Sequence, residues 1–587
     1  MRSVRVSRIR RLWGLKNIFW LTSVCEFACS NVALGVLLAL ALISCDQVTT
    51  LFLQGGQRQL KANMHPTSRR LRTSEGPRMI IFAFDGVGYD QFMAAVHSGK
   101  APRMQALLGT QKSRDLFEHA YSIPNAVDVL PTTMPGWTAT FTGLPPAWNG
   151  VTGDEFFIRE QMDFYAPVPV SVDSPDDALR MLSANLLGKV IETPTVFERL
   201  GLRSYVSLNG VYRGADVFTD LDRGSYAGML AAVAKGLLPG TSVAREVFAD
   251  VDEDSVNALT ENIEKNGFAN LQVVYFPGID LYTHRAINPL ESQVSYLEDF
   301  TDGNVGKVLD YYRKRQALDQ TYVLFVSDHG HTPVLDDNRH ALGSNENHDL
   351  PTLVQKTGFR VRPFALNAPD QDYQALLAYE GVMAYLYLAD RSTCRAKAAR
   401  CDWRKPPRLG KDVMPVVRAL YHVNRTGVPV PGLRGTLDLI FARKPVSAGH
   451  NANTFEVFDG KKLVPVYEYL WRHPRPDLIQ LDKRIGWLSA GPYGDRAGDI
   501  AVLPRFTNVP IQHRFYFGPR YHSEHGSPSM QDSHIPFVLA CTAASGEHLQ
   551  SLVKKTVNRE PSQLDVVPLI LRLLTPSKQL SKHTDSD

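Results

Sequence analysis

Three uninterrupted runs of apolar residues occur along the chain, and each one leads into an aspartate. The runs are RMIIFAF, LQVVYF and YVLFVS, which lead toward Asp85, Asp280 and Asp328. Runs without polar–apolar alternation are typical of strands buried on both faces, as in a parallel sheet between helices. Amphipathic stretches such as Ser255–Asn266 and Gln293–Arg315 separate them. The pattern predicts an α/β fold with a mostly parallel sheet covered by helices on both faces.

The pattern changes in the second half of the chain. Residues 342–500 are rich in Pro and Arg and contain short strand-like pieces, TLDLIFAR and NTFEVFDG. We expect them to form an inserted cap-like subdomain between a first core part, 78–341, and a second, 501–575. The pieces RAGDIAVLP and HIPFVLAC are expected to resume the core, and Pro561–Thr575 to close it as a helix. The polar residues 576–587 predict a flexible tail.

The N-terminal region predicts a targeting segment. Residues 1–45 begin with basic residues and continue into an apolar run of signal-peptide length that ends at Cys45. The stretch LISC resembles the bacterial lipoprotein cleavage box, in which the cysteine is lipidated and becomes the mature N-terminus. The alternative is an uncleaved anchor over Ile18–Cys45, against which Glu26 argues. Both predict an exported protein anchored to the membrane on the periplasmic or extracellular side, with 46–77 as a tether.

Composition and charge narrow the function classes. The chain has 587 residues, of which 44% are hydrophobic and 21% charged, as expected of a folded protein. Its formal charge of +4 is concentrated in the leader, so the remaining chain is near neutral and offers no electrostatic reason to expect a nucleic-acid partner. The six cysteines fit an exported protein. Cys394 and Cys401 are close enough to form a small disulfide loop, and Cys541 is expected to pack as an apolar residue.

The residues that follow the apolar runs form a candidate metal-binding set. Asp280 and His284 are spaced i, i+4, which places both on one face of a helical turn. Carboxylates mixed with imidazoles suit Zn²⁺, and six such groups match two ions about 4 Å apart, as in two-metal phosphoryl-transfer sites. The six candidate ligands are Asp85, Asp280, His284, Asp328, His329 and His525.

The stretch LPTTMPGWTATFTG supplies a candidate nucleophile. No His, Cys or Lys lies nearby in the sequence to take a proton from its hydroxyls. A hydroxyl bound to a metal ion has a lowered pKa and needs no neighbouring base. We favour Thr133 over Thr132 because Thr133 directly precedes Met-Pro-Gly, where a turn or helix N-terminus would direct free N–H groups toward an oxyanion.

Five motifs together carry a family resemblance. FDGVG, TTMPGWTATFTG, GIDLYTH, SDHGH and HGSP follow one another in this order. The set resembles the alkaline phosphatase superfamily and, within it, the type I phosphodiesterase/nucleotide pyrophosphatase family. The resemblance covers Arg78–Ala341 and Ala501–Leu574, leaves the insertion unmatched, and implies an alkaline phosphatase-like fold.

The resemblance also implies roles for the candidate residues. It assigns one zinc ion to Asp280, His284 and His525, and the other to Asp85, Asp328 and His329, with Thr133 bound to the second ion. The reaction would pass through a phospho-threonine intermediate, and the first zinc would activate water for the second step. The chain would then be an exported two-zinc hydrolase of small phosphoric esters, with diesters or nucleotide-like pyrophosphates as expected substrates.

Two other functions stay open at this point. A phosphomonoesterase on the same site is the near alternative. From a different class, the chain would be a surface-anchored binding protein with a structural metal site, although such zinc sites tend to be rich in cysteine. A sulfatase is disfavoured because its Cys or Ser stands in a C/S-x-P-x-R setting, whereas Thr133 is followed by Met-Pro-Gly-Trp.

One stretch departs from the family pattern. Where the family often has an Asn in a HGIIDN-like stretch that helps to bind a phosphate oxygen, this chain reads NGVTGD, with Asp154 at the matching point. A carboxylate there would repel an anionic substrate unless protonated or metal-bound, so either the register is shifted or the phosphate pocket differs. Among the histidines, His522 is the alternative to His525 as a ligand. Those expected to be surface or structural residues are His331, His340, His348 and His534.

Overall fold

The structure is a computed structural model that describes residues 71–72, 74–168, 170, 186–219, 244–344, 346–363, 373–394, 401–445 and 453–575. The predicted leader, most of the predicted tether and the predicted tail lie outside the described residues. Among the helices in these ranges, none is both long and apolar enough to span a bilayer.

A seven-stranded sheet forms the centre of the core, in the order β2-β17-β8-β1-β7-β5-β6. The strands are β1 (Arg78–Phe84), β2 (Ala120–Ser122), β5 (Ser204–Ser207), β6 (Val217–Thr219), β7 (Leu271–Phe276), β8 (Thr321–Ser327) and β17 (Phe537–Ala540). Strands β8, β1, β7, β5 and β6 run parallel, and β17 lies antiparallel between β8 and the edge strand β2. The prediction of an α/β fold with a mostly parallel sheet is confirmed.

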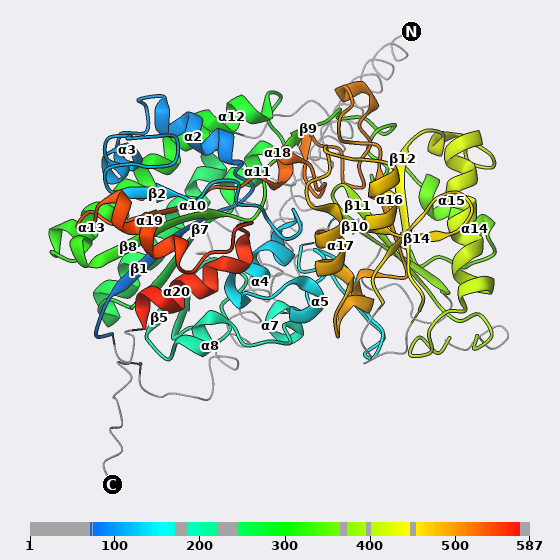
Figure 1. The fold of residues 1–587 in the computed structure, drawn as a ribbon, viewed down its shortest axis with the longest axis horizontal. Helices are drawn as coiled ribbons and strands as arrows, with labels where there is room; N and C mark the ends of the chain where they lie inside the picture. Colours follow the sequence, from blue (N-terminus) through cyan, green and yellow to red (C-terminus); the bar gives the residue numbers. More distant parts are fainter. Residues whose placement is uncertain are drawn as a thin grey trace, which may run out of the picture. The chain divides into compact units, whose positions relative to one another are not determined.

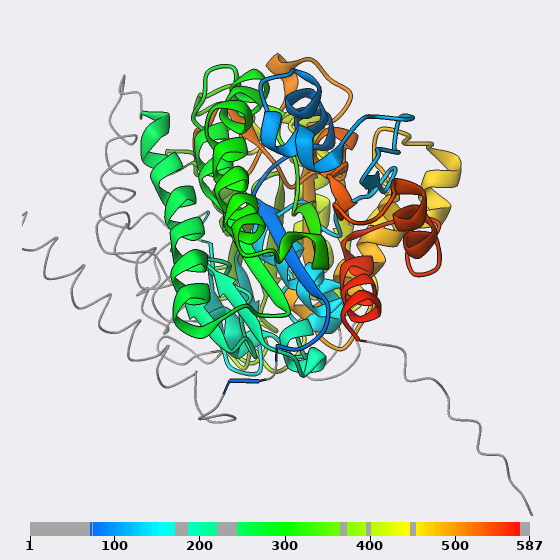
Figure 2. The ribbon, with the colours of Figure 1, turned by 90° about the vertical axis from the view of Figure 1, so that its left-hand side faces the viewer.

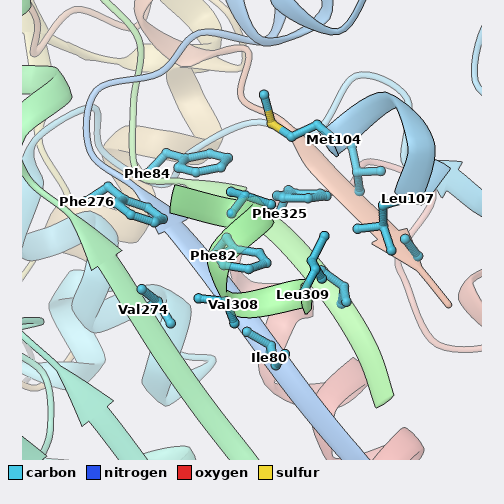
Figure 3. Close-up of a cluster of buried hydrophobic side chains, with 14 of the residues drawn as sticks. Ile80, Phe82, Phe84, Met104, Leu107, Val274, Phe276, Val308, Leu309 and Phe325 are labelled. Atoms are coloured by element: carbon cyan, nitrogen blue, oxygen red, sulfur yellow. The ribbon is translucent and has the colours of Figure 1, made fainter. Parts of the chain in front are cut away.

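Both faces of this sheet are buried, which explains the uninterrupted apolar runs. Ile80, Phe82 and Phe84 of β1 face one hydrophobic cluster, and the alternating residues Met79 and Ile81 face another. Figure 3 shows the first cluster, where the rings of β1 lie between those of its two neighbours. Burying one such side chain contributes about 1.5–3 kcal/mol.

Helices cover the two faces of the sheet. The first face packs against α2 (Tyr89–His97), α3 (Pro102–Leu108), α10 (Arg245–Asn266) and α13 (Asp302–Lys314). The second packs against α4 (Thr133–Thr142), α8 (Val196–Leu200), α19 (Gly546–Lys554) and α20 (Val566–Leu574). In Figure 2 the blue strand β1 lies between green helices on one side and the red helix α20 on the other.

The helix boundaries differ in detail from the predicted ones. The stretch Gln293–Arg315 is helical up to Lys314, but a π-helical turn at Leu297–Thr301 joins α12 (Pro289–Tyr296) to α13 within it. Such a turn inserts one extra residue and shifts the face that follows it. The apolar periodicity of the stretch does not reveal this shift.

A second, antiparallel sheet lies within the insertion, in the order β10-β11-β15-β12-β13-β14 (Figure 1). Its strands are β10 (Ala375–Glu380), β11 (Met383–Leu388), β12 (Leu437–Ala442), β13 (Glu456–Phe458), β14 (Leu463–Pro465) and β15 (Ile500–Pro504). Helices α14 (Asp349–Lys356) and α15 (Met414–Thr426) pack on one face, and α16 (Val466–Arg472) and α17 (Leu481–Ser489) on the other.

Strand β15 corrects one expectation. The piece RAGDIAVLP was expected to resume the core, but β15 pairs with β11 and β12 in the middle of the second sheet. The core resumes at β17, which pairs with β8. A short apolar run indicates that its strand is buried on both faces, but it does not indicate which sheet the strand joins.

The predicted disulfide is present. Cys394 and Cys401 are bonded at an S–S distance of 2.01 Å. Cys541 is buried directly after β17, as expected of a residue that packs as a small apolar group.

Candidate active site

The parallel strands bring the predicted site residues to one edge of the core sheet. Phe84, the last residue of β1, pairs with Phe276 of β7 on one side and with Ser327 of β8 on the other. The residues that follow these three strand ends therefore meet, as expected where parallel strands end together. Asp85 and Asp328 come directly after their strands, and α11 (Gly278–Thr283) carries Asp280.

Three residues form a first cluster, at which the loop after β16 (Ser523–Glu524) meets α11. Nε2 of His284 lies 3.4 Å from Oδ1 of Asp280, and Nε2 of His525 lies 3.8 Å from the same oxygen. The three ligand atoms are all within 4.8 Å of one another. His522, the alternative to His525, is instead one-third exposed and lies 4.0 Å from Asp336.

A second cluster is formed by Asp85, Asp328 and His329, again within 4.8 Å of one another. Nε2 of His329 lies 3.5 Å from Oδ1 of Asp85 and 3.6 Å from Oδ2 of Asp328. Both carboxylate oxygens are buried and have no hydrogen-bond partner within the described ranges. Unsatisfied anionic oxygens that face each other are unstable without a cation, so this donor set fits a divalent metal ion.

The three imidazoles of the two clusters share one hydrogen-bonding pattern. Nδ1 of His284 contacts the carbonyl oxygen of Ser523 at 2.8 Å, that of His329 contacts Gly330 at 3.1 Å, and that of His525 contacts Pro131 at 2.9 Å. Because a carbonyl oxygen only accepts, each Nδ1 carries the proton and each Nε2 directs a lone pair into the site. This tautomer is the one that binds metal through Nε2.

Burial and neighbouring charges shift the pKa values of these groups. Burial lowers the pKa of His284 to about 4 and that of His329 to about 3, which keeps both imidazoles neutral. Burial and the nearby carboxylates raise the pKa values of Asp85 and Asp328 well above the usual range. Burial would also raise the pKa of Asp280, but the surrounding histidines, led by His284, bring it well below its usual value. Neutral imidazoles beside carboxylates are the ligand forms that Zn²⁺ takes.

Thr133 lies at the second cluster. Its Oγ1 is 3.3 Å from Nε2 of His329, and it is the first residue of α4, preceded by the extended Thr132. The side chain is 6% exposed, whereas Thr132 is fully buried. Of the two threonines, only Thr133 contacts the candidate ligands, and it does so at a helix N-terminus, where N–H groups favour negative charge.

Asp154 also lies at this helix N-terminus. Its Oδ1 accepts the backbone N–H of Met134 at 2.8 Å, and burial raises its pKa to about 7. Its own N–H donates to Glu380, at the end of β10, which ties the insertion to the site. Asp154 therefore lies next to Thr133, at the N-terminus of α4.

One histidine contacts the site although no role in the site was expected for it. His331 was expected to be a surface or structural residue, but it is 1% exposed and its Nε2 lies 2.9 Å from Oδ1 of Asp280. One signal was available, because residues i and i+2 of an extended segment share a face, which places His331 on the side of His329. His340 and His534 have other partners, Asp337 and Tyr89 respectively, and His348 is exposed.

A tyrosine that the sequence analysis did not single out supports the second cluster. The hydroxyl of Tyr275, on β7, donates to Oδ2 of Asp85. The ring of Tyr275 also packs edge-to-face on that of Trp137, with 5.5 Å between the ring centroids. Trp137 lies on α4, the helix that carries Thr133.

The α/β fold and the carboxylates and imidazoles gathered at its strand ends agree with the family that the sequence motifs resemble. The family model for type I phosphodiesterase/nucleotide pyrophosphatase matches residues 79–392, more than half of the chain. The chain belongs to this family, and it is a phosphoric ester hydrolase. A comparison with curated proteins found no significant match.

Several solved structures match this chain at low sequence identity. Murine ectonucleotide pyrophosphatase/phosphodiesterase 5 is 12% identical, with 85% of this chain and 95% of that chain covered and a TM-score of 0.46. The human protein of that name is 14% identical, with 85% and 94% covered and a TM-score of 0.46. Phosphonoacetate hydrolase from Sinorhizobium meliloti 1021, in complex with phosphonoformate, is 14% identical, with 87% and 100% covered and a TM-score of 0.42.

Proposed function

We propose that this protein is a two-zinc hydrolase that cleaves phosphoric diesters or nucleotide-like pyrophosphates through a phospho-threonine intermediate. The observation that carries the proposal is the position of Thr133 Oγ1, 3.3 Å from Nε2 of His329, at the N-terminus of α4. This position combines a buried hydroxyl, a set of carboxylate and imidazole donors, and a helix end that favours a phosphoryl group.

Each cluster would hold one zinc ion. Asp280, His284 and His525 are the ligands proposed for one ion, and Asp85, Asp328 and His329, with Thr133, are those proposed for the other. When bound, the two ions supply positive charge to the phosphoryl group and lower the pKa of the coordinated hydroxyl.

The chain's own residues would then carry the reaction in two displacements. Oγ1 of Thr133 attacks phosphorus, the bond from phosphorus to the leaving oxygen breaks, and a phospho-threonine forms. Water attacks the same phosphorus from the side that the leaving group has vacated, and the bond to Oγ1 breaks to restore the threonine. The free N–H groups at the start of α4 stabilise the charge that develops on the phosphoryl oxygens.

Asp154 supports a preference for diesters over monoesters. A monoester carries two negative charges at neutral pH and a diester one, so an added carboxylate penalises the monoester more. Arg159 pairs with Asp499 and carbonyl groups of the insertion, so its charge is already compensated. Arg285, which stacks on Tyr521 beside His284, is a cation next to the first cluster.

A chromogenic assay of the purified protein tests this function. We expect zinc-dependent hydrolysis of a nitrophenyl phosphodiester with a higher kcat/KM than that of the matching monoester, and no hydrolysis of nitrophenyl sulfate. A higher kcat/KM for the monoester would favour the phosphomonoesterase alternative. Binding of zinc without hydrolysis of any of the three would favour a binding protein with a structural metal site.

We further propose that the protein is exported and anchored to the membrane through a lipid on Cys45. The support is the basic and apolar pattern of the leader and its end at LISC. The alternative is a signal anchor in which the leader is kept. The near-neutral chain after the leader gives no electrostatic reason to expect a nucleic-acid partner.

A further inference from the structure

His331 occupies a position among the candidate metal ligands that the family resemblance does not assign. It follows His329 by two residues and precedes β9 (Thr332–Pro333), which pairs with β16. Asp280, His329 and His331 offer ligand atoms within 4.8 Å of one another. This third triad shares Asp280 with the first cluster and His329 with the second, so His331 lies where the two clusters meet.

The hydrogen-bond partners of His331 define which of its nitrogens carries a proton. Nδ1 contacts Oγ of Ser523 at 3.1 Å. The same hydroxyl donates its single proton to the carbonyl oxygen of Thr283, at 2.9 Å. Because a serine hydroxyl has one proton to donate, Oγ must accept from His331, and Nδ1 carries the proton.

The other nitrogen then faces an acceptor. In the neutral imidazole with a protonated Nδ1, Nε2 presents a lone pair, and it lies 2.9 Å from Oδ1 of Asp280. Two acceptor atoms this close repel each other unless a cation lies between them. The arrangement repeats that of the three assigned histidines, with Nδ1 donating to a partner and Nε2 directed into the site.

We infer that His331 is a fourth imidazole ligand of this metal centre and binds through Nε2 an ion shared with Asp280. The inference rests on the proposed metal sites and adds one ligand to them. A further protein ligand tightens metal binding, and a catalytic zinc site that expands to five-coordinate keeps a position for water. The rival role is that of a positioning residue, in which His331 is protonated on both nitrogens and donates to Asp280.

Metal binding to the full-length protein distinguishes the two roles. The variant His331→Gln retains a donor toward Asp280 but removes the imidazole. The protein is stripped of metal and titrated with Zn²⁺ against a chromogenic chelator, and then with Co²⁺, whose visible absorption reports coordination. We expect His331→Gln to weaken binding at one site at least tenfold and to change the Co²⁺ spectrum.

A matched control is His340→Gln, because His340 is also a buried histidine that contacts a carboxylate, that of Asp337, at 2.8 Å. This variant should leave the affinities and the spectrum unchanged. Loss of an outer hydrogen-bond partner alone can weaken metal binding 10–100-fold. Because glutamine keeps a donor toward Asp280, a positioning role alone predicts binding close to that of the wild type. Wild-type affinity and spectrum in His331→Gln would therefore overturn the inference.

A structure of the zinc-loaded wild-type protein tests the inference without any variant. Nε2 of His331 within about 2.1 Å of an ion is the expected result. An Nε2 that contacts only the Asp280 carboxylate overturns it. If the wild-type protein binds no zinc at all, the two-zinc function fails as well, whereas normal zinc binding without His331 removes only this inference.

Discussion

Oγ1 of Thr133 lies 3.3 Å from Nε2 of His329, although 196 positions separate the two residues in the chain. The helix that starts at Thr133 packs on one face of the core sheet, and His329 follows a central strand of that sheet. The proposed nucleophile has no basic neighbour in the sequence, and the contact shows that the groups proposed to activate it come from other strands.

Removal of the nucleophile should abolish turnover without affecting the fold. We expect Thr133→Ala to lower kcat for a nitrophenyl phosphodiester by several orders of magnitude, because it removes the hydroxyl proposed to form the covalent intermediate. Steady-state kinetics, circular dichroism and elemental analysis measure turnover, fold and zinc content. Thr132→Ala is the matched control and should have far less effect. Comparable turnover in wild type and Thr133→Ala would refute the assignment.

Metal content should follow the two clusters. We expect close to two zinc ions per chain, loss of activity on chelation and recovery when zinc is added. Asp280→Asn should mainly empty one site and Asp328→Asn the other, because each removes a carboxylate ligand. Asp337→Asn, whose carboxylate pairs with His340 outside the clusters, serves as the control. Elemental analysis of each variant provides the count, and full activity of the metal-free enzyme would contradict the two-metal mechanism.

Asp154 should set the preference between substrate charges. At an effective dielectric constant of about 20, one unit charge at about 5 Å costs a second roughly 3 kcal/mol as an upper value, and about 1.4 kcal/mol is a factor of ten in rate. We expect Asp154→Asn to raise kcat/KM for the monoester relative to the diester by tenfold or more. Assays at pH 9 keep the wild-type carboxyl, with its pKa of about 7, ionised. An unchanged ratio would show that Asp154 does not act on the phosphoryl group.

Asp252 should make folding stability depend on pH. Burial raises its pKa from 3.8 to about 8, and its carboxyl oxygens accept from Gly278 N–H and Tyr296 hydroxyl. Because the folded-state pKa exceeds the unfolded one, this contribution to stability is complete below pH 3.8 and is lost as the pH rises through 8. A pKa that is higher by one in the folded than in the unfolded protein corresponds to about 1.4 kcal/mol of stability.

The test compares urea unfolding at pH 5 and pH 8. The free energy of unfolding should fall more between these values in wild type than in Asp252→Asn, which does not titrate. Asp482→Asn, at an exposed position of α17, should behave like wild type. Equal losses in wild type and Asp252→Asn would show that the carboxyl is ionised in the folded protein.

The anchoring proposal predicts a defined mature N-terminus. The membrane form of the protein should begin at Cys45 and carry acyl groups, because the leader ends in a lipoprotein-like box. Mass spectrometry of the N-terminal peptide measures both. Cys45→Ala should block lipidation and processing, and residues 1–44 on the wild-type membrane form would favour the signal anchor instead.

The central strands and the residues at their ends could be predicted from the sequence alone. A strand buried on both faces needs apolar side chains at every position, so β1, β7 and β8 are visible as uninterrupted runs. Because parallel strands end at a common edge, Asp85, Asp280 and Asp328 were expected together, and the structure brings them together. These features depend on local pattern and chain direction alone.

Three further features depend on contacts between distant parts of the chain: the sheet that β15 joins, the position of Asp154 and the partners of His331. Pairing of β15 requires partner strands far away in the sequence, and an apolar run is compatible with either sheet. The role proposed for His331 depends on the hydroxyl of Ser523, 192 positions away. This hydroxyl donates its hydrogen bond to the carbonyl oxygen of Thr283. A metal site forms only where ligand atoms from distant parts of the chain meet in space. The sequence gives their order along the chain but not which of them meet.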